Sequence, residues 1–217
     1  MQPAQQIAEW ADKLRDMTAM GLHYARDQYD RQRYEAIQIM IVEMLALATA
    51  QPRVTLDPLR ASVLARPTPI SGGDGAVIDE RGNILLIQRA DNGKWAMPGG
   101  ALEVGETAAQ GAVREVLEET GTTCAATRLV GVFDSRYTGL LSTNHVYHFV
   151  FLCAPDASRP PQPASHAHEV LQTAWVHETA LSALANNMLQ GHGARIIEAF
   201  RVWHGDSRAF FDASQPT

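Results

Sequence analysis

Apolar residues follow two different periods along the chain, and the change falls near residue 66. Before that point they recur three or four positions apart, which is the spacing of one face of an α-helix. This pattern predicts two long helices and a small all-helical domain over residues 1–66. The positions that carry the pattern are Ile7, Trp10, Ala11, Leu14 and Met17, followed by Tyr34, Ile37, Met40, Ile41, Met44, Leu45 and Ala48.

Local signals indicate where these helices begin and end. Asp30 is a candidate N-cap for the second helix, and Gln51-Pro52 ends that helix. Asp57 is a candidate cap for a shorter third helix that runs to Leu64. The residues 66–69, Arg-Pro-Thr-Pro, cannot continue a helix, because proline lacks an amide hydrogen and restricts the residue before it. They are typical of a linker.

Beyond the linker, residues 67–217 show the shorter period of β-strands. Residues 75–78 and 83–88 flank the turn residues 79–82, which predicts a hairpin. Further strands are expected over residues 127–133, 145–153 and 170–176, and closing helices over 179–189 and 194–203. Strands interleaved with helices predict an α/β domain with a mixed sheet.

One helical segment between the strands carries three closely spaced glutamates. Glu115, Glu118 and Glu119 fall at i, i+3 and i+4, so their side chains would face the same side of a helix. Carboxylates this close repel one another unless a cation lies between them. Oxygen ligands without a cysteine or histidine beside them in the sequence favour Mg²⁺ or Mn²⁺ over zinc. The spacing therefore predicts a divalent metal site.

The neighbours of these glutamates distinguish the segment from an ordinary solvated acidic helix. Apolar residues between Ala109 and Leu117 form a stripe beside the acidic face, which predicts that the helix packs on a core. Gly111 and Ala108 are small residues on the acidic side, where we expect them to leave room for a ligand. Arg114 flanks the acids and is placed to orient a carboxylate.

The same residues resemble the Nudix box. That pattern is Gly, five residues, Glu, seven residues, then Arg-Glu-hydrophobic-x-Glu-Glu-x-Gly-hydrophobic. It is met by Gly100, Glu106, Arg114, Glu115, Val116, Glu118, Glu119 and Gly121. Thr122 stands where the pattern has its last hydrophobic residue. That position packs after the helix, so the departure bears little on the chemistry.

The resemblance implies a Mg²⁺-dependent hydrolase that cleaves a nucleoside diphosphate linked to another moiety, on a Nudix-type α/β/α sandwich with a mixed sheet. Glu106 and Arg114 would form an orienting ion pair. Glu103 points into the same region in many relatives, or is a loop acid in solvent. The implied metal ligands are Glu115, Glu118, Glu119 and the backbone carbonyl of Gly100.

A pyrophosphate substrate requires charge neutralisation and a proton acceptor. Metal ions neutralise the phosphate charge and lower the pKa of bound water, and the formal charge of −6 on the chain makes them more necessary. Glu119 or another box acid is one candidate general base. Glu169 is the other, because it precedes the last expected strand, where family members often place a carboxylate. Arg136 is a candidate phosphate clamp, although a surface arginine is the simpler interpretation.

Composition limits the cellular setting. Apolar residues make up 46% of the chain, which is ample for a soluble core. Because the sequence shows neither a long apolar run nor a basic leader followed by an apolar segment, we expect a cytoplasmic protein. Cys124 and Cys153 lack metal-binding spacing and are expected to be buried free thiols. The negative charge and the absence of a basic run argue against a nucleic-acid partner.

The helical domain raises a separate question, because a sandwich is complete without it. Three short helices can only partly bury their apolar stripes among themselves, so we expect a homodimer. Residues 24–35 also resemble the N-terminal helical domain of a bacterial Nudix subgroup that includes enzymes acting on CDP-choline and ADP-ribose. The tyrosines and arginines of this segment could line a nucleotide site, but we favour an ordinary charged helix surface with Tyr34 in the helix core.

Three functions therefore compete. The first is hydrolysis of a nucleoside diphosphate linked to choline, ribose or a similar group. The second is cleavage of oxidised nucleoside triphosphates or of RNA 5′ ends, and the negative charge argues against RNA. The third is a nucleotide-sensing module without catalysis, which would have no need of three closely spaced acids.

Overall fold

The computed structural model describes residues 3–58, 69–138 and 146–213. The chain divides into two compact units, the second of which begins at Pro69, and each unit is described by itself. Among the described residues, no helix is both long enough and apolar enough to cross a lipid bilayer.

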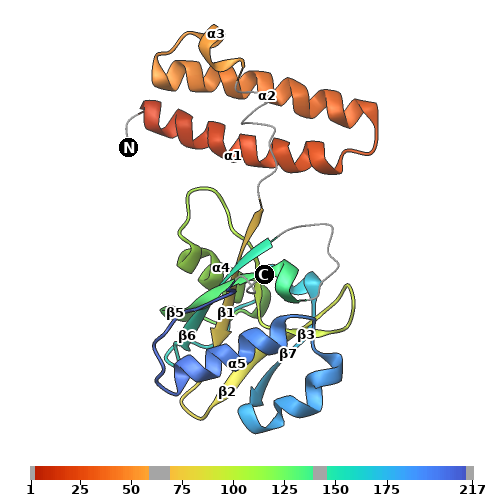
Figure 1. Ribbon diagram of the computed structural model, residues 1–217, viewed down its shortest axis with the longest axis vertical. Coiled ribbons are helices and arrows are strands. Elements are labelled where there is room, and N and C mark those ends of the chain that lie inside the picture. Colours follow the sequence, from red (N-terminus) through yellow and green to blue (C-terminus); the bar gives the residue numbers. More distant parts are fainter. Residues whose placement is uncertain (1–2, 59–68, 139–145, 214–217) are drawn as a thin grey trace. The chain divides into compact units, whose positions relative to one another are not determined.

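The first unit is helical (Figure 1), with α1 (Pro3–Tyr24), α2 (Gln28–Thr49) and the short α3 (Arg53–Leu56). Its core joins all three helices through Ala11, Ile41, Val42 and Leu56. Gly21 of α1 provides the space for the Tyr34 ring, since a Cβ atom there would lie 2.3 Å from the ring. The partly buried Tyr34 ring therefore packs between α1 and α2.

The helix ends differ from the predictions. Asp27, not Asp30, caps α2, because its carboxylate accepts a hydrogen bond from the backbone N–H of Asp30 at 2.8 Å. Asp30 is itself in the first turn, so a good capping residue three positions late misled the prediction. Asp57 follows α3 as its C-cap instead of starting a helix. The predicted continuation to Leu64 lies outside the described residues.

The second unit is an α/β/α sandwich, which confirms the predicted fold (Figure 1). The two long helices are α4 (Ala108–Thr120) and α5 (His192–Trp203). The strands are β1 (Ile70–Val77), β2 (Asn83–Arg89), β3 (Trp95–Ala96), β4 (Gly99–Ala101), β5 (Cys124–Asp134), β6 (Val146–Pro155), β7 (Val170–His177) and β8 (Phe210–Phe211). Shorter 3₁₀ segments are η2 (Ser135–Thr138), η3 (Ala167–Glu169) and η4 (Glu178–Asn187), and η4 replaces the first predicted closing helix.

The strands form two sheets. The larger has the order β4-β1-β6-β5-β8, with β1 parallel to β6 and β5 parallel to β8, and the smaller is the antiparallel β3-β2-β7. The predicted hairpin is therefore wrong. Residues 79–82 do form a turn, with Gly82 at φ 76°, but in the described chain the bridge between Ile78 and Ile84 is all that joins the two strands. β1 pairs instead with β4 at residues 72–74 and with β6 at residues 70–77, whereas β2 pairs with β3 and β7.

The two faces of the larger sheet receive different helices. Gly75 of β1 faces α4, and a Cβ atom there would lie 2.4 Å from Val116, so the glycine permits close helix–sheet contact. On the opposite face, Ala76 and Ile78 pack in one core with Ile196 of α5. Alternate residues of β1 thus touch α4 and α5, as expected for a strand between two layers.

The ends of α4 are set by residues of the box itself. Thr107 and Gln110 form a capping box, in which each side chain accepts a hydrogen bond from the other residue's backbone N–H. Gly121 ends the helix in the left-handed conformation at φ 68°, which glycine adopts without a steric cost. Cys124 and Cys153 are buried and free, as predicted.

Candidate active site

Arg114 lies at the centre of a group of carboxylates on α4 and the loop before it. Its Nε and Nη2 atoms donate to the two oxygens of Glu106 at 3.1 and 3.0 Å. Its Nη1 atom donates to Glu115 and to Glu118, both at 2.9 Å, and Nη2 also reaches the carbonyl of Ala101 at 3.1 Å. The two-point contact with Glu106 fixes the plane of the guanidinium group, which in turn holds the other two carboxylates in place.

Glu119 points to the backbone of the preceding loop. Its Oε2 atom accepts a hydrogen bond from the N–H of Gly99 at 2.8 Å, and the residue is buried. Gly100 beside it leaves space for Glu115, because a Cβ atom at Gly100 would lie 2.6 Å from Glu115 Oε1. Gly100 therefore allows the Glu115 carboxylate to lie against the backbone, while the N–H of Gly99 holds Glu119.

The three glutamates of the predicted triplet do not form one equal cluster. Glu115 and Glu118 have ligand atoms within 4.8 Å of each other and of His166, whereas Glu119 is not part of this group. His166 Nδ1 lies 3.5 Å from Glu118 Oε2. His166 is not among the site residues that the sequence predicts. It reaches the site because its backbone N–H donates to the carbonyl of Glu118 at 2.8 Å. No local spacing could have indicated this contact.

Gly111 has a different role from the one predicted. A Cβ atom at Gly111 would lie 2.3 Å from Leu102 Cδ2 and 2.6 Å from Glu106 Oε1. The space above this glycine is therefore filled by protein atoms and does not remain open for a ligand. Gly111 allows Glu106 to approach the helix and pair with Arg114.

The electrostatics of the site favour a cation. Burial, together with the charge of Glu115, raises the pKa of Glu119 to about 8, and burial also raises the pKa of Glu115. The hydrogen bond to Glu106 raises the pKa of Arg114, which stays charged. The single positive charge of Arg114 thus faces the carboxylates of Glu106, Glu115 and Glu118, and Glu119 is a fourth carboxylate of the site. Oxygen donors in this excess of negative charge fit Mg²⁺ or Mn²⁺.

The remaining predicted residues lie in three different places. Glu169 ends η3, and its charge contributes to the raised pKa of Glu119. Glu103 is exposed in the loop between β4 and α4. Arg136 follows β5 and pairs with Asp134, with Nε 3.0 Å from Oδ1. In the sheet, β1 and β6 lie between β4 and β5, the strand that ends just before Arg136.

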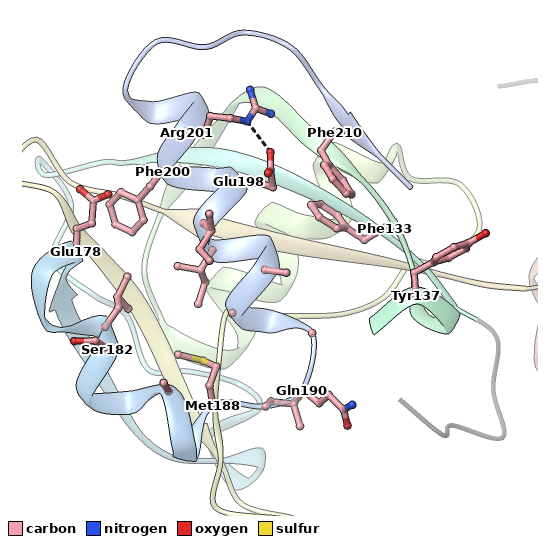
Figure 2. Close-up of a pocket in the computed structure, with 18 of the residues that line it drawn as sticks. Phe133, Tyr137, Glu178, Ser182, Met188, Gln190, Glu198, Phe200, Arg201 and Phe210 are labelled. Carbon is pink, nitrogen blue, oxygen red and sulfur yellow. Dashed lines mark hydrogen bonds and ion pairs between the residues drawn. The ribbon is translucent and has the colours of Figure 1, made fainter. Parts of the chain in front are cut away.

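A groove of about 1000 Å³ lies beside α5 (Figure 2). Phe133 and Phe210 stack on one side of it with ring centroids 4.5 Å apart, and Met188 lies on the other side. Its charged side chains pair with one another, as in the contact between Arg201 and Glu198 at 2.6 Å. No predicted site residue lines this groove.

Comparisons with known proteins agree with the division into two units. Residues 73–200, more than half of the chain, match the family described as "NUDIX domain". Residues 5–59 match the family described as "UDP-X-like, N-terminal oligomerisation domain".

Curated relatives include pyrophosphatases. A Bacillus subtilis protein named "Putative ADP-ribose pyrophosphatase YjhB" is 31% identical over 147 residues, which are 67% of this chain and 70% of that protein. An "ADP-ribose pyrophosphatase" of Methanocaldococcus jannaschii is 43% identical over 70 residues, which are 31% of this chain and 41% of that protein.

Solved structures share the fold. A crystal structure titled as a UDP-X diphosphatase aligns with a TM-score of 0.56 and 23% identity, over 95% of this chain and 97% of that one. An ADP-ribose pyrophosphatase from Streptococcus suis aligns with a TM-score of 0.51 and 25% identity, over 64% of this chain and 95% of that one. Since the matched region contains the whole arrangement of carboxylates around Arg114, the chain belongs to the Nudix family of hydrolases.

Proposed function

We propose that this Nudix hydrolase cleaves the pyrophosphate bond of a nucleoside diphosphate linked to another group, of the CDP-choline or ADP-ribose type. The products would be a nucleoside monophosphate and a phosphorylated second group. The observation that carries the proposal is the set of carboxylates held around Arg114, with Glu119 beside them. The relatives named as ADP-ribose pyrophosphatases and the UDP-X-like match of the helical unit support this substrate class.

The donor set fits a Mg²⁺ or Mn²⁺ ion. When bound, such an ion neutralises phosphate charge and makes a water molecule more acidic. The residues that would hold it are Glu115, Glu118, Glu119 and the carbonyl of Gly100.

The chain's own residues then position the reaction. Glu106 fixes the guanidinium group of Arg114, which keeps the carboxylates of Glu115 and Glu118 in one orientation. The proton of the attacking water passes to a carboxylate, for which Glu119 and Glu169 are the candidates.

Two other predicted residues would contact the substrate. Arg136 follows β5, which is separated from β4 by two strands, and it is a candidate contact for a part of the nucleotide away from the carboxylates. Glu103, exposed in the loop that leads to α4, is a second candidate contact.

A substrate panel tests this function. The protein would be incubated with Mg²⁺ and, separately, CDP-choline, ADP-ribose, a UDP-linked sugar, a dinucleoside polyphosphate and an oxidised nucleoside triphosphate, and the products identified by mass spectrometry. We expect a nucleoside monophosphate and a phosphorylated second group from at least one of the first three, and none when EDTA is added. Absence of turnover on every compound would contradict the proposal and favour a nucleotide-sensing module.

A second candidate function is cleavage of oxidised nucleoside triphosphates. It is supported by a Bacillus subtilis protein named "Putative 8-oxo-dGTP diphosphatase", which is 46% identical over 58 residues, 27% of this chain and 39% of that protein. Cleavage of a triphosphate to its monophosphate releases pyrophosphate. The products in the same panel therefore distinguish the two functions.

We also propose that the helical unit, expected over residues 1–66, forms a homodimer through the outer face of α2. On one side of α2, Ile41 and Val42 are buried in the core with α1. On the opposite side, Met40 and Leu47 leave 55% and 75% of their surface exposed. A helix that is apolar on both sides is typical of one buried on both sides. The match to an oligomerisation domain supports a second copy as the partner.

Sedimentation of the variant M40E/L47E tests the dimer. We expect the unaltered protein to sediment at about twice the chain mass of 23.7 kDa, and the variant to sediment as a monomer because buried carboxylates would face each other in the interface. Glu35→Gln, an exposed change on the same helix, serves as the control. A monomeric unaltered protein, or a dimeric variant, would contradict the proposed interface.

A further inference from the structure

A buried ion pair connects α5 to β1 on the side of the sheet opposite α4. Arg195 Nη1 donates to Asp74 Oδ2, and the two residues are 1% and 3% exposed. His148 Nδ1 of β6 lies 3.4 Å from the same carboxylate oxygen. Burial alone would raise the pKa of Asp74, but the charge of Arg195 and the contact with His148 together outweigh it, and the pKa falls well below its usual range. The pair is therefore charged on both sides and cut off from solvent.

The carboxylate of Asp74 lies directly against the backbone of Gly99. The two residues are register partners in the antiparallel pair of β1 and β4. A Cβ atom at Gly99 would lie 2.5 Å from Asp74 Oδ1, so only glycine leaves room for the carboxylate in this orientation. Gly99 also donates its N–H to Glu119, and it is thus in contact with both the buried ion pair and the carboxylate cluster.

Three hydrogen bonds hold the short segment that enters the box. Met97 N–H donates to His192 Nδ1 of α5 at 3.1 Å. Gly75 N–H of β1 donates to the carbonyl of Pro98 at 3.0 Å. Gly99 N–H donates to Glu119 Oε2 at 2.8 Å. The segment is consequently fixed from α5, from β1 and from α4.

We infer that Asp74 and Arg195 are positioning residues that set the location of the backbone at Gly99 and, through its N–H, the orientation of Glu119. The chain of contacts runs from Arg195 to Asp74, then to Gly99 and to Glu119. The inference rests on the proposed function, because it assigns Glu119 to the reaction.

Stability alone does not account for this pair. A buried ion pair is often no more stabilising than apolar side chains of similar volume, because both charges lose their hydration. The ion pair fixes the orientation of the Asp74 carboxylate, because a carboxylate held by a guanidinium group in a site without solvent has few alternative positions. A shift of about 1 Å in a catalytic group can reduce turnover about a hundredfold, so a fixed position has direct value at Gly99.

The test compares two arginines of α5. Arg195→Met removes the partner of Asp74, and Arg201→Met is the matched control, because Arg201 is on the same helix but pairs with Glu198 in the groove of Figure 2. For R195M we expect kcat to fall about tenfold or more with KM nearly unchanged. We also expect faster hydrogen exchange at the Gly99 amide, measured by NMR without metal or substrate. R201M should change neither quantity.

Two further variants guard against simple misfolding. Asp74→Asn combined with Arg195→Gln removes both charges, so no buried charge is left unpaired, and the double variant is expected to fold and still lose turnover. Arg195→Lys keeps the positive charge and should restore part of the lost kcat. A folded double variant with unaltered kcat and unaltered Gly99 exchange would overturn the inference. Absence of turnover in the unaltered protein would instead contradict the proposed function, while the exchange measurement would still test the positioning.

Discussion

The helices α4 and α5 cover opposite faces of one sheet, yet they use charge in opposite ways. On α4, Arg114 and its carboxylates come from one short stretch and are partly open to solvent. On α5, Arg195 and His192 are buried, and their partners lie 121 and 95 positions away in the sequence. Under the proposed function, α4 would carry the reacting groups and α5 would support the backbone that they contact.

The largest expected effect is the loss of the α4 carboxylates. Glu118→Gln and Glu119→Gln should each reduce kcat on the order of 10²- to 10⁴-fold, because an amide neither binds a cation strongly nor accepts the proton of water. The steady-state rate at saturating Mg²⁺ is the measurement, with circular dichroism to verify folding. Glu80→Gln in an exposed turn is the control. If both variants kept full activity, the assignment of the metal site to α4 would be wrong.

A smaller decrease in kcat is expected for the Arg114→Lys variant. Lysine keeps the charge but cannot make the two-point contact with Glu106 while holding Glu115 and Glu118, so kcat should fall about tenfold to hundredfold. Arg201→Lys on α5 is the matched control and should leave kcat unchanged. Equal kcat in both lysine variants would show that charge alone, without the planar geometry, orients the carboxylates.

Replacing a glycine by alanine should change the stability of the protein in opposite directions on the two helices. Gly111→Ala on α4 forces Leu102 or Glu106 to move and should cost about 1–3 kcal/mol of stability. Gly193→Ala on α5 meets no atom within 4 Å and should stabilise the protein by about 0.5–1 kcal/mol. Thermal unfolding measures both. A stabilising Gly111→Ala would mean that the space above this glycine is available, as the sequence first suggested.

A last prediction concerns pH and the burial of His192. Burial lowers the pKa of His192 from its ordinary 6.5 to about 3, so between these values the unfolded chain binds a proton that the folded protein does not. Its contribution to stability is therefore complete above about pH 6.5 and decreases as the pH falls toward 3. His192→Asn keeps an acceptor for Met97 N–H without this titration. We expect the difference in melting temperature between the unaltered protein and the His192→Asn variant to narrow as the pH falls. A constant difference would contradict the conclusion that His192 is buried in its neutral form.

Much of the α4 site follows from sequence because its contacts are local. The pairing of Glu106 with Arg114 spans eight positions, within one loop and two helical turns, so the spacing of the box already brings these side chains close together. The role of Gly111 was not predictable in the same way. Its neighbour Leu102 belongs to the loop before the helix, and only the path of that loop decides whether the space is filled.

Strand pairing shows the same limit at the level of the fold. The turn at residues 79–82 was identified from its chemistry, and it exists. Its two strands nevertheless belong to different sheets, in which β1 pairs with β4 and β6 while β2 pairs with β3 and β7. A local turn signal cannot show which of several strands will occupy an edge. The approach of His166 to Glu118 depends on a long loop and was missed for the same reason.

By itself, the sequence determined the α/β class and the helix of the box, and it predicted two domains and an acidic site, because periodicity, capping and short spacings act within a few helical turns. The tertiary structure decided which glutamates lie together, which glycines are packed and which strands are paired. It also decided that Asp74 and Arg195 meet beneath Gly99. The physical reason is that burial brings distant residues into contact at a place where an unpaired charge is costly, and no spacing in the chain encodes that encounter.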